Sequence, residues 1–315
     1  MTKLSFSDNF YFVVDEFRRY EWFSESPFQN VHLTSHRLKE DFTWVMYAIV
    51  AIAFAHFVAE RFIFQPLAQY SLPAPKGSSI KGDKLSLKST GSDNITPAQR
   101  KFNTACYKFV LYSSMSAYGF YALYDQPWAL NGKALFENHP NQEFPDKLRI
   151  YHLIEMSHYI YAMAAFVWEP RLKDFYQMVF HHIVTMTLIT FSYTAGLYRV
   201  GAVILLLHDV SDPLMEIAKL FFYTKHEKLS NAFFFLFATV FIYTRDYFFP
   251  TFAIYSVWHY GRNDDGSRVP YTMECLVFLS LLQTIHVFWS YLIVNMVVEA
   301  VAHNGVQGDT RDDKD

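Results

Sequence analysis

Seven apolar stretches, separated by polar or charged segments, run along the chain. A helix needs about 20 mainly apolar residues to cross a hydrocarbon core, and each stretch is close to that length. The first stretch carries Glu60 and Arg61 near its end and the third carries Glu155, so these two are the least typical. The pattern predicts an all-α polytopic membrane protein with about seven transmembrane helices, at 43–64, 107–127, 150–169, 175–195, 199–223, 231–257 and 272–299.

The composition supports a membrane protein rather than a soluble domain. Of the 315 residues, 52% are hydrophobic, 19% are aromatic and only 18% are charged, whereas soluble domains carry about 25% charged residues. The aromatic residues suit lipid-facing and interfacial positions. The two cysteines, Cys106 and Cys275, lie in or beside apolar stretches, which argues against a disulfide scaffold or a thiolate metal site.

The loop between the first two stretches is basic. Seven Lys or Arg residues in 76–108 are opposed by two Asp. Cytosolic loops carry an excess of basic residues, so we expect this loop in the cytosol, the N-terminus in the lumen and the C-terminus in the cytosol. Asn94 begins a glycosylation pattern but would lie on the cytosolic side, so we expect it to be unmodified. The predicted parts are a lumenal N-terminal segment (1–42), a first transmembrane helix (43–64), a basic cytosolic loop (65–100), a domain of six transmembrane helices (101–300) and a cytosolic acidic tail (301–315).

Five ionisable residues interrupt the fourth and fifth stretches. They are His181, His182, His208, Asp209 and Asp212. Ionisable side chains are costly at membrane depth and usually face a bundle interior or a cavity. His208 and Asp212 are expected to share a helical face, and so are Asp209 and Asp212, and Pro213 in the same stretch is expected to kink the helix and open a cavity. With the topology above, both sets lie in the cytosolic half of the bilayer. The pattern therefore predicts an intramembrane site.

The residue types at this site favour proton transfer or acyl transfer. Adjacent histidines on a helix point about 100° apart, so the two are expected to have different roles. A carboxylate that accepts the N–H of one imidazole fixes its tautomer and leaves the other nitrogen basic. That imidazole can take a proton from a nucleophile, or can itself take an acyl group. Two other interpretations stay open, a polar network that joins helices and an iron or zinc site.

The segment from 181 to 223 is similar to the Lag1 motif of the ceramide synthases, in the TLC-domain family. The resemblance is strongest in 171–223 and extends over about 100–299. The sequence departs from the family at Gly196, where Asn is usual, and it lacks a homeobox-like segment between the first two stretches. The matching positions are His181, His182, Thr185, Ser192, Tyr193, Arg199, Gly201, His208, Asp209, Asp212, Leu214, Glu216, Ala218, Lys219 and Tyr223.

The resemblance implies a specific reaction and location. It implies a six-helix TLC barrel preceded by one extra helix, in the endoplasmic reticulum membrane. The implied activity is transfer of a fatty acyl group from acyl-CoA to the amine of a sphingoid base, sphinganine or sphingosine, to form dihydroceramide or ceramide. Acyl-CoA is then a co-substrate, and no other cofactor is expected. Membrane lipids are expected partners, a homodimer or a small accessory subunit is compatible with the pattern, and nucleic acid is not expected.

The resemblance also suggests roles for individual residues. We expect His181 to act as general base or acyl carrier and His182 to assist it. Asp209 and Asp212 are expected to orient the imidazoles and to bind the ammonium or hydroxyl groups. Further substrate-binding candidates from the motif are His208, Glu216, Lys219 and Tyr193. A basic cytosolic rim for the CoA phosphates is expected at Arg171, Lys173, Lys225 and Lys228, although these residues also suit simple positive-inside anchors.

The main alternative is a non-enzymatic TLC-domain protein, a lipid sensor or a translocation accessory. Such a protein would not need both the His-His and the His-Asp pairs together with the Asp, Glu and Lys positions that follow them. Another lipid enzyme, such as a hydroxylase, would contain bound iron. The enzymatic interpretation is therefore preferred.

Overall fold

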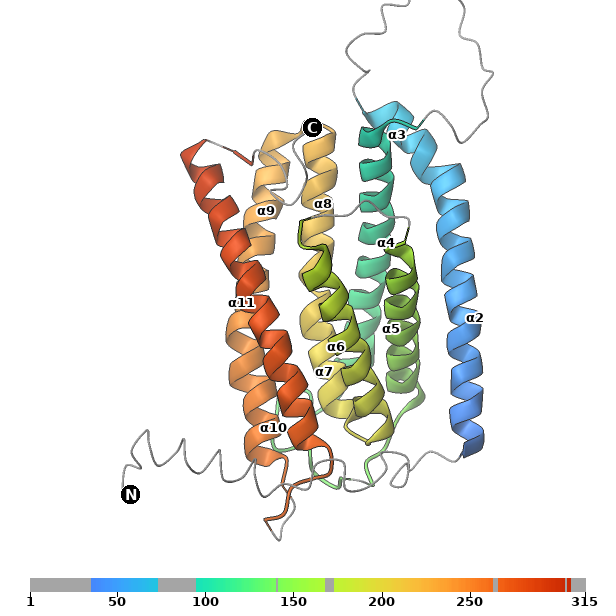
Figure 1. Ribbon diagram of the computed structural model, residues 1–315, viewed down its shortest axis with the longest axis vertical. Helices are drawn as coiled ribbons and strands as arrows, with labels where there is room; N and C mark the ends of the chain where they lie inside the picture. The colour runs from blue at the N-terminus through green and yellow to red at the C-terminus, as the bar shows by residue number, and fades with distance from the viewer. Residues whose placement is uncertain are drawn as a thin grey trace, which may run out of the picture.

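The computed structural model is built of helices (Figure 1) and describes residues 35–72, 95–139, 141–167, 173–262, 266–303 and 305–306. No strand occurs within these ranges, apart from an isolated bridge between Arg262 and Arg268. Predictions for 1–34, for most of the basic loop including Asn94, and for the tail from 307 lie outside the described residues. In chain order the helices, with η for π-helix, are α2 (Ser35–Ala59), η1 (Glu60–Phe64), α3 (Gln65–Ser71), α4 (Pro97–Leu123), α5 (Asp146–Ala165), α6 (Phe175–Thr194), α7 (Tyr198–Asp209), α8 (Asp212–Tyr223), α9 (Glu227–Phe241), η3 (Ile242–Ile254), α10 (Tyr255–Tyr260) and α11 (Thr272–Ala302).

The prediction of an all-helical membrane protein is confirmed. Helices cover most of each of the seven apolar stretches. In the described part of the chain, three continuous helical segments are long and apolar enough to cross a membrane, Leu38–Ser71, Glu227–Tyr260 and Thr272–Ala302. The helices between them are shorter, broken or more polar. The number of membrane crossings and the six-helix barrel therefore stay predictions.

The fifth apolar stretch forms two helices instead of one. α7 ends at Asp209, α8 begins at Asp212, and Pro213 lies in the first turn of α8. Proline is favoured in a first helical turn because its missing N–H is not needed there. The stretch is thus interrupted directly before Pro213, where a kink was expected, and His208 and Asp212 belong to two helices rather than to one. The break instead places one carboxylate at the C-terminal end of α7 and another at the N-terminal end of α8.

The helices after residue 95 are arranged in a ring. α4 contacts α5 and α8, α5 contacts α6, α6 contacts α11, α11 contacts α9 and η3, and α9 contacts α8. α7 packs against α4, α6 and η3, while α2 stands outside the ring against α5 (Figure 1). α5 and α6 have 20 residues each, against 27 in α4 and 31 in α11. The two short helices therefore end below the upper ends of their neighbours in Figure 1.

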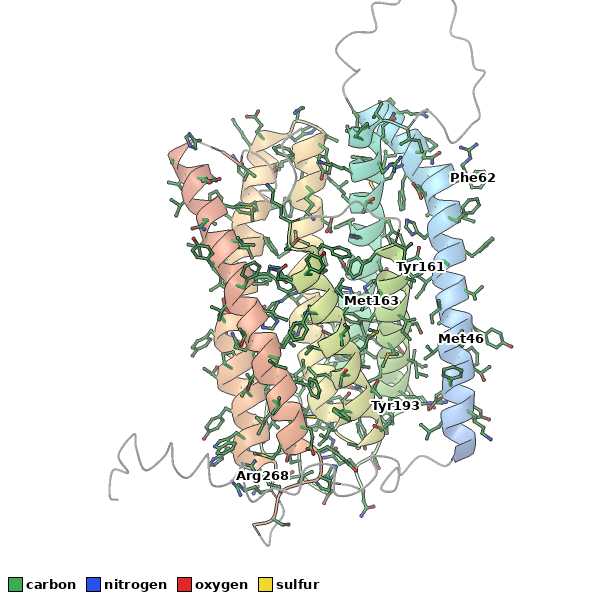
Figure 2. All side chains as sticks on the ribbon, in the orientation of Figure 1. Met46, Phe62, Tyr161, Met163, Tyr193 and Arg268 are labelled. Carbon is green, nitrogen blue, oxygen red and sulfur yellow. The ribbon has the colours of Figure 1, made fainter. Side chains whose placement is uncertain are left out.

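Large apolar side chains cover the outer face of α2 and of η1, which follows it. Phe42, Phe54 and Phe62 are exposed by 68%, 67% and 70%, and Phe62 points away from the bundle (Figure 2). A contiguous apolar surface of this kind is unusual for a protein in water but suits contact with lipid. On the inner face of the same helix, the Asp41 carboxylate is buried and accepts hydrogen bonds from Arg149 and Tyr193. These bonds join α2 to α5 and α6.

Gly201 allows α6 and α7 to pack closely. A Cβ atom at Gly201 would lie 2.5 Å from Ser192 Oγ and 3.0 Å from His152 Nε2, closer than real contacts permit. We therefore expect Gly201→Ala to lower the free energy of unfolding by about 1–3 kcal/mol, the usual cost of overpacking a core. Denaturant titration in detergent micelles measures this change. Adding Ser192→Gly, which removes the clashing atoms, should recover part of the loss; an unchanged stability in Gly201→Ala alone would contradict the prediction.

Candidate functional site

A cavity of about 680 Å³ lies inside the ring of helices. Cavities of roughly 300–1,000 Å³ are typical of small-molecule sites. Its wall is largely apolar along α9 and α11, where Phe234, Phe237 and Leu292 line it. The polar lining falls into two groups. One contains Lys101, Lys173, Lys219 and Glu299, and the other contains Glu155, His158, His181, His182, Asp209, Asp212 and Arg245.

Both histidines of the His-His pair line this cavity, from α6. The Nδ1 of His182 lies 2.8 Å from the carbonyl oxygen of Met178. A carbonyl only accepts, so this nitrogen carries the hydrogen, and the lone pair of the neutral ring is on Nε2. The His181 ring packs edge-on against Trp289, with ring centroids 5.1 Å apart, and its buried Nδ1 has no hydrogen-bond partner within the described ranges. The two rings thus have different surroundings.

The two aspartates line the cavity at the α7–α8 break. Asp209 accepts a 2.5 Å hydrogen bond from the Tyr151 hydroxyl. Asp212 accepts a 2.7 Å hydrogen bond from Arg245 Nη2, which also donates to the carbonyl oxygen of His208 at 2.7 Å. The expectation that these carboxylates orient the imidazoles of His181 and His182 is not met by these contacts. A backbone carbonyl fixes the tautomer of His182 instead.

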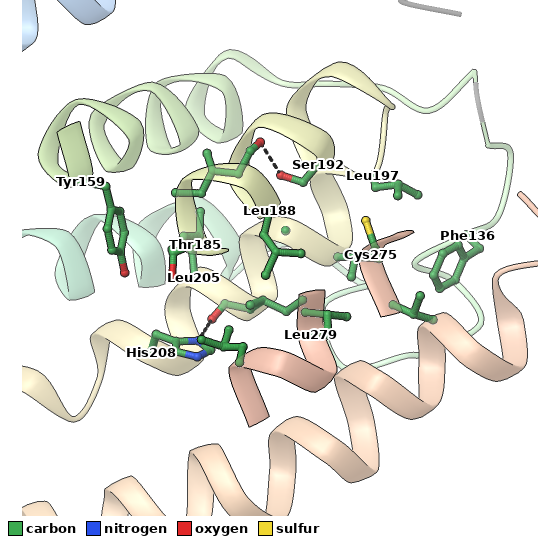
Figure 3. A pocket seen from close by; sticks show the side chains of 16 residues that line it. Phe136, Tyr159, Thr185, Leu188, Ser192, Leu197, Leu205, His208, Cys275 and Leu279 are labelled. Atoms are coloured by element: carbon green, nitrogen blue, oxygen red, sulfur yellow. Dashed lines mark hydrogen bonds between the residues drawn. The ribbon is translucent and has the colours of Figure 1, made fainter. Parts of the chain in front are cut away.

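His208 lies away from the main cavity. Its Nδ1 donates to the carbonyl oxygen of Ile204 at 2.6 Å, and its Nε2 lies 3.0 Å from Nε2 of His286 on α11. The ring borders a second, smaller cavity of about 40 Å³, lined mainly by apolar side chains (Figure 3). Tyr159 lines both cavities. His208 is therefore placed to hold α7 to α11 rather than to bind a substrate in the main cavity.

Two other motif residues are placed as structural contacts. Tyr193 donates to Asp41 and does not line the main cavity, which contradicts its prediction as a substrate contact. Glu216 is buried and also does not line it, but it pairs with Lys219, whose Nζ lies 3.0 Å from Glu216 Oε1. Lys219 itself lines the cavity. Glu216 is thus placed to position Lys219.

The expected basic rim is only partly found at the cavity. Lys173 lines it, whereas Arg171 lies outside the described residues. Lys225 and Lys228 are exposed and do not line the cavity, so they suit anchoring positions. Lys101, from the first turns of α4, takes a place in the lining that we did not predict.

Several residues at the site were not identified from the sequence. Arg245 and Glu155 both line the cavity and are buried. Trp289 packs on His181 and donates from Nε1 to Asp174 Oδ2 at 3.2 Å. Arg245 and Glu155 could have been identified because both lie inside apolar stretches, and a charged residue at membrane depth needs a partner. Within the described ranges, no group of three or more His, Cys, Asp or Glu is placed to hold a metal ion.

Comparison with known proteins gives consistent matches. A family model of the TLC domain matches residues 101–295. The chain is 35% identical to ceramide synthase 4 of Bos taurus over 214 residues, which are 68% of this chain and 54% of that protein. It is 30% identical to ceramide synthase LOH2 of Arabidopsis thaliana over 286 residues, 87% of this chain and 93% of that one. It is 33% identical to ASC1-like protein 3 of Oryza sativa subsp. japonica over 269 residues, 83% and 90% of the two chains. The matches thus span about half the length of the animal relative and nearly all of the plant relatives.

Proposed function

Because the chain belongs to the ceramide synthases of the TLC-domain family, we propose that it is an acyl-CoA-dependent sphingosine or sphinganine N-acyltransferase that forms ceramide or dihydroceramide. The observation that carries the proposal is that His181, His182, Asp209 and Asp212 all line one large cavity. Imidazoles and carboxylates on the wall of one cavity are suited to general base or acyl-carrier chemistry.

The cavity lining matches the two parts of an acyl-CoA. Lys101, Lys173 and Lys219 would bind the anionic phosphates of CoA, since ammonium groups are common phosphate ligands. The aromatic side chains of α9, such as Phe234 and Phe237, would enclose the apolar acyl chain. The thioester then lies between these two regions, where the histidines are.

The reaction needs a base and a way to release the thiol. The amine nitrogen forms a C–N bond with the thioester carbonyl carbon, the C–S bond breaks, and the proton taken from the amine goes to the CoA thiolate. We favour His181 as the base, or as a carrier that accepts the acyl group before the amine does. His182, whose Nδ1 is held by Met178, would assist through its Nε2.

The location and assembly are proposed on the same basis. We place the protein in the endoplasmic reticulum membrane with the N-terminus in the lumen and the C-terminus in the cytosol, so that the lysine-lined part of the cavity faces cytosolic acyl-CoA. A homodimer or a small accessory subunit is compatible with the exposed apolar face of α2.

One experiment tests the reaction directly. The purified protein is incubated with acyl-CoAs of graded length, its intact mass is measured, and sphinganine is then added while amide and free thiol are quantified. We expect amide formation that depends on both substrates, with one thiol released per amide. An acyl adduct within 171–223 that disappears on adding the amine would identify the carrier mechanism. Absence of both amide and adduct, with sphinganine still bound, would favour the non-enzymatic interpretation, and stoichiometric iron would favour a hydroxylase.

A further inference from the structure

Glu155 is a carboxyl group that the chemistry above does not use. It lies in the middle of α5, its side chain is 0% exposed, and it lines the main cavity. Neither of its oxygens receives a hydrogen bond from a donor in the described part of the chain. A buried carboxylate without a donor costs several kcal/mol, so Glu155 needs either a proton or a ligand.

Glu155 shares its side of the cavity with Asp209. Asp209 is hydrogen-bonded to Tyr151, which lies one helical turn before Glu155 on α5, and both carboxyl groups line the cavity. Two buried carboxyl groups on one cavity wall disfavour each other's ionised form, so we expect the pair to hold one proton. Tyr151 donates to Asp209 from the other side at 2.5 Å. A carboxyl pair thus lies at the α7 side of the cavity.

The charges around this pair leave one negative charge unbalanced. Arg245 balances the negative charge of Asp212, with Nη2 of the arginine 2.7 Å from Oδ1 of the aspartate. Glu155 and Asp209 with one shared proton carry a charge of −1, and the Tyr151 and Tyr159 hydroxyls beside them are neutral. One cation with several N–H donors would balance this charge and supply the donors that Glu155 lacks. A primary ammonium group has both properties.

We propose that Glu155 and Asp209 together bind the ammonium group of the long-chain amine substrate and take its first proton. This inference rests on the proposed function and specifies where the second substrate binds. Tyr159 is four residues after Glu155, so the two share a helical face about one turn apart, and the Tyr159 ring is 5.3 Å from that of His182. The ammonium would therefore be held on the same side of α5 as Tyr159, which lies next to His182.

The proton balance of this step is simple. The ammonium transfers one proton to the carboxyl pair, which then holds two, and becomes a neutral amine. The amine nitrogen attacks the acyl carbon, the bond to sulfur or to the imidazole nitrogen breaks, and the histidine takes the second proton and passes it to the thiolate. The first proton returns from the carboxyl pair to solvent, so each turnover releases one proton and one thiol.

The test compares Glu155→Gln with the parent protein, because glutamine keeps the shape of the side chain and cannot take the proton. We expect kcat/KM for sphinganine to fall at least 10-fold, while KM for acyl-CoA and acyl adduct formation without amine stay within twofold. Glu274→Gln, which changes another buried glutamate outside the cavity lining, is the matched control and should leave both substrates unaffected. Unchanged kinetics for sphinganine in Glu155→Gln, or an equal loss for both substrates, would overturn the inference.

A second measurement uses the parent protein alone and does not depend on how the variant folds. A long-chain primary amine should compete with sphinganine at least 10-fold better than the primary alcohol of the same chain length. Equal competition by the two compounds would overturn the inference. If the parent forms neither amide nor acyl adduct, the proposed function itself fails, and this outcome is distinct from an active parent that does not discriminate amine from alcohol.

Discussion

Replacing His181 with alanine is expected to reduce amide formation by about 10²- to 10⁴-fold, the usual contribution of a general acid–base group. The side chain lines the cavity and packs against Trp289, so alanine removes the proposed base without opening the outer surface. The measurement is the initial rate with saturating acyl-CoA and sphinganine, normalised to the amount of protein in the membrane. Intact mass, measured on the same samples, shows whether an acyl adduct is lost as well.

Two further variants make this result specific. His226→Ala changes an exposed histidine in the turn before α9 and should leave the rate unchanged. His182→Ala should also lower the rate, and an adduct that persists in one of the two cavity variants would assign the acyl carrier to the remaining histidine. A His181→Ala protein that accumulates normally and forms amide at the parent rate would contradict the catalytic role.

Replacing Arg245 with methionine is expected to lower the free energy of unfolding by about 3–5 kcal/mol, because it leaves the Asp212 carboxylate as an uncompensated charge inside the bundle. Arg245 is buried, donates to Asp212 and to the carbonyl oxygen of His208, and lies 4.4 Å from the centre of the Phe241 ring. Methionine fills a similar volume, so the main change is the lost charge. Denaturant titration in detergent micelles measures the effect.

A double variant separates the charge effect from the packing effect. Adding Asp212→Asn to Arg245→Met removes the unpaired charge and should recover about 1–3 kcal/mol, the range of coupling found for residues in direct contact. Arg245→Lys keeps the positive charge but carries it on a single nitrogen. Its free energy of unfolding should therefore lie between those of the parent and Arg245→Met. Strictly additive effects of the two substitutions would show that the ion pair does not couple α8 to η3.

Much of the fold could be predicted from the sequence because membrane depth constrains it strongly. A stretch of about 20 apolar residues has few structures available other than a helix, and helices are found at all seven stretches. A complete break at 210–211 was not predicted. Pro213 indicated a disturbance, but a proline can kink a helix or begin a new one, and the sequence does not decide between them.

The candidate site could be predicted in part, for a related reason. His181, His182, Asp209 and Asp212 stand out as polar residues in apolar stretches, and all four line one cavity. Their partners could not be predicted, because Tyr151 and Arg245 come from helices far along the chain. His208 and Tyr193 show the opposite error. Their place in the motif suggested contact with substrate, whereas their hydrogen bonds join helices, a role that single-sequence reasoning does not distinguish from binding.

The unequal helix lengths set the level at which the cavity meets water. With 20 residues each, α5 and α6 are about 30 Å long, which equals the thickness of a hydrocarbon core. α11, with 31 residues, is about 46 Å long, and its excess lies at the end that carries Glu299 of the cavity lining. If the hydrocarbon core is level with α5 and α6, the lysine-lined part of the cavity would project by about 15 Å into the headgroup layer. The nucleotide of the proposed acyl-CoA substrate could then stay hydrated while its acyl chain reaches the depth of the lipid tails, and bilayer thickness would contribute to substrate selection.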